Sequence, residues 1–228
     1  MRAGTLAVAA LVVVSACARP PRPAAPTAPP VPVAGPGAVY RLVPEDSVLT
    51  VYAYRAGPMA SFGHNHVLVL AGLTGELHVP DNPEQVSGDI KAQLADFRID
   101  DPAARQMAGA DFPGEIAAGD ISGTRQNLLG PQLLDAAQFP ELHASVLRAH
   151  GGPSEYAVTL AVTVRGVGST QDFPAHLAIT PGELTAEGEI RVSQRALGLP
   201  PFSILMGALS VDDSLRVHYR IVARATGS

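Results

Sequence analysis

Apolar and polar residues alternate along most of the chain after Val39, with the period of two that is typical of β-strands. The alternation predicts strands over 48–54, 86–94, 158–164, 173–179, 184–192 and 215–223. A longer extended run over 66–79 is interrupted by Gly72 and Gly75, and glycines inside a strand commonly mark bends that let a sheet close. Each predicted strand has one apolar and one polar face, as in antiparallel sheets with one side in water.

The inward-facing candidates on these strands are mostly Val, Ala, Gly, Leu and Ile, and they form one apolar surface that must be buried. A β-sandwich and a closed barrel both bury such a surface, and the alternation alone does not choose between them. An eight-stranded barrel is just wide enough either to be filled by side chains or to hold one small ligand. Small lining residues favour a cavity, and a filled interior is the alternative.

The middle of the chain carries the signals of two short helices. Asp101 is an N-cap candidate and Pro102 suits the first helical position, which predicts a helix over 101–107. A second short helix is predicted over 120–129. One face of this second helix holds Ile121, Thr124 and Leu128. Together the two helices form an insert that can cap one end of a barrel.

The N-terminus has the three parts of a secretory signal peptide. Arg2 gives a positive start, an apolar run extends over 5–14, and small residues precede Cys17. The sequence Val14-Ser15-Ala16-Cys17 resembles the lipobox of bacterial lipoproteins, in which the cysteine is lipidated and becomes the first residue of the mature chain. We therefore expect residues 1–17 to be a lipoprotein signal peptide, with an ordinary signal peptide as the alternative.

Residues 18–38 are predicted to be a proline-rich linker, because eight prolines fall among Ala, Val and Gly residues there. Such a segment forms a semi-extended spacer, and at about 3.1 Å per residue it reaches about 65 Å. The folded domain is then expected over 39–226. We expect an exported, membrane-anchored lipoprotein, at the outer membrane or periplasmic face of a Gram-negative cell or otherwise at the cell surface.

Composition and missing motifs exclude several classes of function. The net charge is −5, and Lys91 is the one lysine among 16 basic residues, so no basic surface for nucleic acid is expected. Cys17 is the only cysteine, which leaves no disulfide and no catalytic thiol in the mature domain. The sequence lacks the nucleophile elbow, the His-Glu-x-x-His zinc motif and the phosphate and dinucleotide loops of common enzymes. We therefore expect a protein that is not an enzyme.

Several short segments resemble, in their order and spacing, those of the YceI-like family. They are Gly-His-Asn-His at 63–66 before 73–77, 124–127 before 139–142, 163–167 before 173–175, and 192–195 before 197–199. The resemblance covers about residues 39–223. The chain departs from the family pattern at Arg165, where histidine is common, and at Gln194 and Leu197.

The resemblance implies an all-β fold with short helices, namely an extended, antiparallel, lipocalin-like barrel of eight strands. It also implies that the lumen carries a long apolar molecule, of polyisoprenoid or isoprenoid-quinone class, without chemical change. The expected partners are this lipid and, through the N-terminal anchor, a membrane, while a homodimer is left open. No metal or other cofactor is predicted. A structural envelope protein with a filled barrel is one alternative function.

His64 and His66 are the sharpest local candidates for chemistry. In an extended backbone the two imidazoles fall on one face, where they could contact a ligand or hold a transition metal. A metal- or haem-associated redox or stress protein is therefore a second alternative function. A metal site needs further ligands, and the other histidines have no recognised ligand spacing. Hydrogen bonds from both imidazoles to the backbone or to a carboxylate are the favoured interpretation.

The remaining candidate ligand-binding residues lie in apparent loops, and they are Phe62, Arg195, Phe202 and Met206. Arg195 either meets a polar headgroup at the barrel mouth or pairs with Asp212 or Asp213, and the ion pair is the favoured alternative. The two phenylalanines and Met206, together with Leu205, either gate the lumen or form core at the barrel end. Met adapts to irregular ligands, but the pattern does not choose between these roles.

Overall fold

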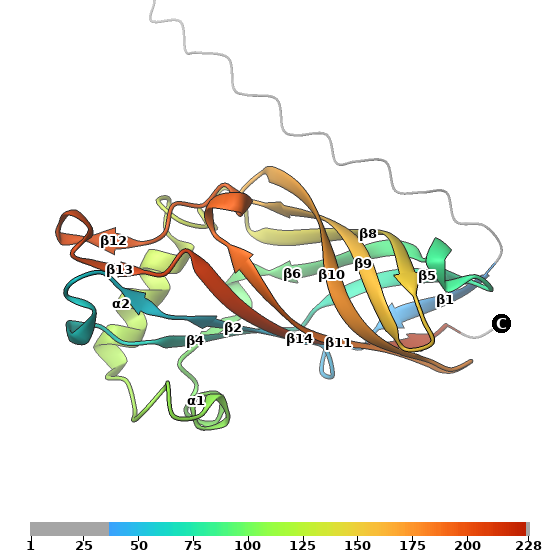
Figure 1. Cartoon of the computed structure of the whole chain (residues 1–228), viewed down its shortest axis with the longest axis horizontal. Coiled ribbons are helices and arrows are strands. Elements are labelled where there is room, and N and C mark those ends of the chain that lie inside the picture. Colours follow the sequence, from blue (N-terminus) through green and yellow to red (C-terminus); the bar gives the residue numbers. More distant parts are fainter. Residues whose placement is uncertain (1–36, 227–228) are drawn as a thin grey trace, which may run out of the picture.

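The computed structural model describes residues 37–226 and shows a long, twisted β-barrel (Figure 1). Within this part of the chain, eight strands close the barrel, and each is antiparallel to its neighbours. In order around the wall they are β1 (Gly37–Leu42), β5 (Thr74–Pro80), β6 (Ser87–Gln93), β8 (Glu141–Gly151), β9 (Glu155–Val164), β10 (Val167–Ile179), β11 (Glu183–Ser193) and β14 (Ser214–Ala225).

Closure of the barrel depends on β1, which pairs with β5 on one side and with β14 on the other. Tyr40 lies opposite Leu77 of β5 and also opposite Ala225 of β14. A sandwich would leave these two edges unpaired, so the pairing of β1 decides for the barrel. The predicted fold class is confirmed.

The run predicted over 66–79 forms two strands that meet at a bend. β4 (His66–Ala71) pairs with β2 (Val48–Ala53), and β5 pairs with β1. Because β1 and β2 pair with different parts of β14, β4 and β5 lie one after the other along the wall. Gly72 lies at the bend with a φ of 73°, in the left-handed region that favours glycine. β7 (Phe97–Ile99) pairs with β4 and widens this side of the wall.

The alternation did not predict β8, because a β-bulge interrupts its period. Leu142, Ala144 and Val146 face the interior with a period of two. The register then shifts between Val146 and Arg148, and the next buried residue is Ala149. An inserted residue moves every later side chain to the other face of the strand, so no single period runs through β8.

The predicted insert contains α1 (Pro102–Ala108) and α2 (Ala118–Leu129), and the two helices cover different surfaces. Asp101 caps α1 as predicted, because its side chain accepts a hydrogen bond from the Ala104 amide at 3.1 Å. The chain after α1 covers the outer face of β2 and β4, where Phe112 packs against Val67. The expectation that the insert caps the barrel is therefore correct for α2 and wrong for α1.

A second, three-stranded sheet extends the barrel at the end where α2 lies (Figure 1). Its strands are β12 (Ser203–Ile204), β13 (Leu209–Val211) and β3 (Arg55–Ala56). Short 3-10 helices connect other elements: η1 (Ala60–Phe62), η2 (Pro83–Gln85), η3 (Leu94–Asp96) and η4 (Arg195–Leu197). η5 (Leu205–Gly207) is a tight turn in which all three residues have positive φ.

The predicted signal peptide, 1–17, and nearly all of the predicted linker, 18–38, lie outside the described residues. β1 begins at Gly37, slightly before the expected start of the domain at Val39. Among the helices of residues 37–226, none is long and apolar enough to cross a membrane.

Candidate functional site: an apolar barrel lumen

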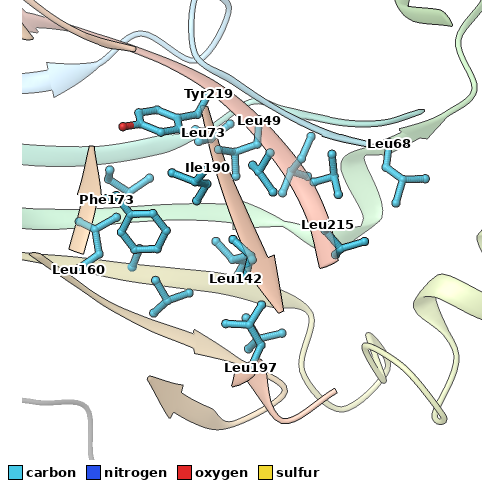
Figure 2. Close-up of a pocket in the computed structure, with 18 of the residues that line it drawn as sticks. Leu49, Leu68, Leu73, Leu142, Leu160, Phe173, Ile190, Leu197, Leu215 and Tyr219 are labelled. Carbon is cyan, nitrogen blue, oxygen red and sulfur yellow. The ribbon is translucent and has the colours of Figure 1, made fainter. Parts of the chain in front are cut away.

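The barrel encloses a cavity of about 370 Å³ (Figure 2). This volume falls within the range of small-molecule sites, roughly 300–1,000 Å³. Most of the lining side chains come from strands far apart in the sequence, and they point toward one another. Those labelled in Figure 2 are Leu49, Leu68, Leu73, Leu142, Leu160, Phe173, Ile190, Leu197, Leu215 and Tyr219.

Many lining residues are only half-buried, although they point into the barrel. They include Leu49, Val51, Ile90, Leu142, Leu160, Val162, Ala186, Ile190, Leu215 and Val217. In a close-packed core such residues would lose nearly all of their accessible surface. Their remaining surface faces the cavity, so side chains do not fill the lumen. The alternative of a filled barrel does not describe this structure.

Polar side chains in the cavity wall gather mainly at the end that α2 covers. His66 stands at the start of β4, Thr124 and Asn127 lie on α2, and Gln194 follows β11. Tyr219 is the further polar residue, and it stands in the middle of the wall. Among the described residues that line the cavity, none is Asp, Glu, Lys or Arg. The lumen is therefore apolar with a hydrogen-bonding end.

α2 is held over the cavity by an apolar face and by one arginine. Ile121 and Leu128 pack against the barrel core, and Leu128 lines the cavity together with Thr124, as the predicted helix face requires. On the same helix, Arg125 donates to two backbone carbonyl oxygens, including that of Phe97 just after η3. These contacts fix the polar side chains of α2 against the end of the lumen.

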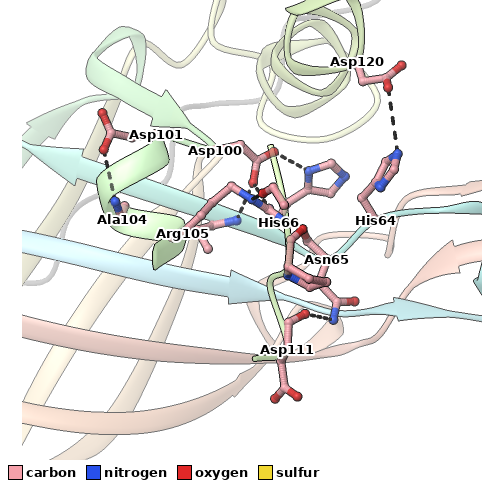
Figure 3. Close-up of polar contacts among 12 residues, drawn as sticks. His64, Asn65, His66, Asp100, Asp101, Ala104, Arg105, Asp111 and Asp120 are labelled. Atoms are coloured by element: carbon pink, nitrogen blue, oxygen red, sulfur yellow. Dashed lines mark hydrogen bonds and ion pairs between the residues drawn. The ribbon is translucent and has the colours of Figure 1, made fainter. Parts of the chain in front are cut away.

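His66 belongs to a buried ionic network beside the cavity (Figure 3). Its Nδ1 lies 2.6 Å from Oδ2 of Asp100, whose side chain is fully buried. The other carboxylate oxygen accepts hydrogen bonds from the Val67 amide at 2.9 Å and from Arg105 at 2.7 Å. Because an ionised carboxylate only accepts hydrogen bonds, we infer that His66 carries its proton on Nδ1. The Asp100 carboxylate thereby fixes the orientation of the imidazole.

Arg105 is 4% exposed and ties this network to the loop after α1. Its other hydrogen bonds reach the carbonyl of Asn65 and two carbonyls in that loop. Burial opposes ionisation of Asp100, but hydrogen bonds from His66, from a backbone amide and from Arg105 outweigh it and hold the pKa of Asp100 below its usual value. The ionised carboxylate compensates the charge of the buried guanidinium.

His64 lies outside this network, near α2. Its Nε2 is 3.8 Å from Oδ2 of Asp120, and both side chains are about half exposed. The rings of His64 and His66 are 6.4 Å apart, and each faces a different carboxylate. The favoured interpretation is confirmed for His66, which hydrogen-bonds Asp100, whereas the 3.8 Å contact of His64 is too long for a hydrogen bond. Within residues 37–226, no group of three or more His, Cys, Asp or Glu residues is placed to hold a metal ion.

The other predicted ligand-binding residues occupy three kinds of position. Phe202 lines the cavity. Arg195 is largely exposed and its guanidinium lies 3.4 Å from Asp213, so it forms the favoured ion pair. Phe62 and Met206 are exposed and do not line the cavity, and Leu205 is exposed beside Met206. These three apolar residues are therefore neither lumen lining nor barrel-end core.

The wall of the barrel has a short ladder between β10 and β11. Residues 176–179 of β10 pair with residues 184–187 of β11, and beyond them β10 pairs with β9 while β11 pairs with β14. Phe173 and Ile190, which belong to the stretches without this pairing, both line the cavity. The cavity lining therefore extends along the part of the wall where β10 and β11 are not joined.

Sequence reasoning missed the roles of Asp100, Arg105 and Tyr219. Asp100 directly precedes the N-cap residue of α1, so its pattern is that of an ordinary helix start. Its burial depends on His66, which lies 34 positions away, and no local signal marks that contact. The alternation over 215–223 places Tyr219 on the apolar face of the last strand, whereas its hydroxyl partner lies on a different strand.

A closed antiparallel barrel with an apolar lumen is the architecture of lipocalin-like proteins. A family model described as YceI-like domain matches residues 40–223, and the chain belongs to this family. The match confirms the resemblance found in the sequence. No curated protein matches the chain.

Several solved structures share the fold, including the following two. The crystal structure of BcnA from Burkholderia cenocepacia has a TM-score of 0.56 and 14% identity, covering 79% of this chain and 98% of that one. The structure of a polyisoprenoid binding domain from Saccharophagus degradans has a TM-score of 0.54 and 12% identity, covering 82% of this chain and 99% of that one. At such low identity the likeness concerns the fold.

Proposed function

We propose that this protein binds a long, apolar, lipid-like molecule in its barrel, at the cell envelope, and does not change it chemically. The observation that carries the proposal is the lumen, in which half-buried apolar side chains face about 370 Å³ of unfilled space. Covering apolar surface stabilises a complex by about 25 cal/mol per Å² before the costs of binding are subtracted. An apolar chain inside the barrel would cover this surface.

The shape of the lumen favours an extended ligand. The strand β11 has 11 residues, which corresponds to about 36 Å at about 3.3 Å per residue. Phe202 at one end of the barrel and Leu184 at the start of β11 both line the same cavity. A linear chain suits such a space better than a compact ring system, which supports polyisoprenoids and isoprenoid quinones as the ligand class.

The polar end of the lumen favours an uncharged headgroup. His66, Thr124, Asn127 and Gln194 offer hydrogen-bond donors and acceptors, whereas no Lys or Arg lines the cavity among the described residues. A phosphate group would lack the cation that commonly pairs with it. We therefore propose a hydroxyl or quinone headgroup at the end that α2 covers.

Two further observations support the proposal. The similar structure from Saccharophagus degradans is named a polyisoprenoid binding domain. The predicted lipidation of Cys17 would hold the barrel at the membrane from which such lipids come, and Ala18 after it fits outer-membrane sorting better than an aspartate would.

Mass spectrometry of bound lipid tests the proposal. The full chain is purified from its expression host, extracted with organic solvent, and separately incubated with a polyprenol and with an isoprenoid quinone. We expect stoichiometric recovery of an isoprenoid lipid or uptake of one of the two additives. An empty barrel that takes up neither additive would overturn the proposal.

A pair of alanine substitutions locates the bound lipid. Ala186 lines the lumen, whereas Ala178 is exposed on the neighbouring strand β10. We expect Ala186→Phe to reduce the bound lipid several-fold, because the added ring occupies cavity volume, and Ala178→Phe to leave it unchanged. Equal lipid content in both variants would place the ligand outside the lumen.

A further inference from the structure

Two loops meet beyond the end of the barrel that α2 covers. One loop runs over 57–63 after β3, and the other runs over 202–210 and contains β12 and η5. They are joined by the pairing of β3 with β13 and by a hydrogen bond from the Met59 amide to the Ala208 carbonyl at 2.8 Å. In Figure 1 this end lies opposite the end where β1 begins.

These loops expose an unusual set of large apolar side chains, which we call the apolar tip. Phe62 is 74% exposed, Ile204 44% and Leu205 60%, and Met206 is fully exposed. Single exposed apolar residues are common on protein surfaces, but four on two adjoining loops form a patch that commonly marks an interaction site.

The two loops carry no charge. Residues 57–63 and 202–210 include no Asp, Glu, Lys, Arg or His, and their polar side chains are serines. Charged groups are the most costly to move into an apolar medium, at about 2.5–3.5 kcal/mol each on insertion scales. The absence of charge in both loops removes this cost for a lipid bilayer. Arg55 of β3, which donates to the Gly63 carbonyl at 2.7 Å and pairs with Val211, places the adjoining exposed charge at the base of the loops.

The backbone of the tip holds its apolar side chains outward. Leu205 and Met206 both have positive φ, 51° and 54°, a conformation that non-glycine residues rarely adopt. Two successive residues in this conformation form a tight turn whose side chains project away from the barrel. The conformation of this turn therefore keeps the two side chains exposed.

The base of the same loop belongs to the lumen. Phe202 directly precedes β12 and Val211 ends β13, and both residues line the cavity. The tip and the lumen are therefore continuous through this hairpin, and a bilayer that covered the tip would lie against the end of the cavity.

We propose that the apolar tip inserts into the surface layer of a lipid bilayer and holds this end of the barrel against it. Residues 18–36 of the predicted spacer could reach up to about 60 Å at about 3.1 Å per residue. This exceeds the length of β10, whose 13 residues correspond to about 43 Å at about 3.3 Å per residue. The anchored end of the chain can thus reach the same bilayer as the tip. Docking of the tip does not require a lipid in the barrel. Passage of a lipid between the bilayer and the lumen rests on the proposed function.

Depth-dependent quenching tests the docking. The full chain is reconstituted into phosphatidylcholine vesicles that carry a lipid-attached quencher, and a fluorophore is placed on Met206→Cys or on Asp81→Cys. Asp81 is exposed beside the end of β5, where β1 begins, at the opposite end of the barrel. The unsubstituted chain, treated in the same way, reports any label on Cys17. We expect strong quenching at position 206 and little at position 81.

Two variants test the apolar side chains. The double variant Leu205→Asp/Met206→Asp should lower the ratio of docked to undocked protein. We expect a decrease of about tenfold or more for each substitution, because each removes apolar surface that docking would bury. The fluorophore is then read at Phe62→Cys. Met107→Asp, at an 81% exposed methionine on α1, is the matched control and should leave the quenching unchanged.

The outcomes separate docking from the proposed function. Quenching at position 81 alone would show that the other end faces the bilayer, and quenching at neither position would show that the tip stays in water; both overturn the inference. Loss of the signal when labelled chain is diluted with unlabelled chain would assign the tip to a contact between copies and also overturn it. Lipid content, measured by organic extraction of the same samples, reports on the proposed function separately.

Discussion

The Tyr219 hydroxyl donates a hydrogen bond to the Pro174 carbonyl oxygen at the point where β10 and β11 cease to pair. Tyr219 belongs to β14 and lies opposite Gly188 of β11, so its ring crosses β11 to reach β10. Gly188 leaves room for this crossing, because a Cβ atom there would lie 2.5 Å from both oxygens. One side chain of β14 thus contacts β10 across β11, where the backbone ladder between β10 and β11 has ended.

Gly188→Ala should therefore destabilise the protein. The added methyl group would displace the Tyr219 hydroxyl or the Pro174 carbonyl, and overpacking of this kind costs about 1–3 kcal/mol. Chemical denaturation measures the loss. Gly168→Ala on β10 is the matched control, since nothing lies within 4 Å of a Cβ atom at that position. A Gly188→Ala variant as stable as Gly168→Ala would contradict the crossing.

The pH dependence of stability should report Tyr219. Burial raises the pKa of Tyr219 to about 12 in the folded chain. Between pH 10, the ordinary pKa of tyrosine, and about 12, the unfolded chain releases this proton while the folded chain retains it, so stability falls as pH rises through that window. Tyr219→Phe should reduce the slope of the denaturation free energy against pH in this window. An unchanged slope would assign it to other groups.

Asp100→Asn should be strongly destabilising. The substitution leaves the buried Arg105 guanidinium without its carboxylate, and removing one partner of a buried ion pair costs about 3–5 kcal/mol. Asp120→Asn is the control, because Asp120 also pairs with a histidine but is 59% exposed, and exposed pairs contribute about 0–1 kcal/mol. Similar losses in the two variants, measured by urea denaturation, would show that the Asp100 network does not stabilise the fold.

Acid should weaken the same network. The folded-state pKa of Asp100 lies below its usual value, so its contribution to stability is complete above that usual value and is lost as pH falls toward the folded-state pKa. Between neutral and low pH, the free energy of unfolding of Asp100→Asn should accordingly fall less steeply than that of the unsubstituted chain. The control here is Asp120→Asn, whose free energy of unfolding should fall with pH as steeply as that of the unsubstituted chain.

Cys17→Ser should abolish acylation and leave lipid binding by the barrel intact. Incorporation of a labelled fatty acid into the full chain measures acylation, and organic extraction measures the bound lipid. Persistent acylation would refute the predicted lipobox. Loss of the bound lipid along with the acyl label would show that the barrel is loaded only when the chain is anchored.

The sequence by itself determined most strands of the barrel wall and the chemistry of their faces, although the alternation predicted no strand at β1 and only the second half of β10. A strand with one buried face has a period of two that local residue types reveal, which is why β9, β11 and β14 were predicted nearly to their ends. The cap at Asp101 and the apolar face of α2 are likewise local patterns. Local pattern failed at β8, where a bulge changes the period.

Only the tertiary structure decided what those faces enclose. Closure requires β1 to meet β14, and Tyr40 and Ala225 are far apart in the sequence. The burial of Asp100 with Arg105, and the exposure of Phe62 and Met206, likewise depend on which distant segments cover each side chain. The alternation of residue types shows that one face of a strand is apolar. Strand pairing and the volume between opposite walls determine whether that face is close-packed or lines an open lumen.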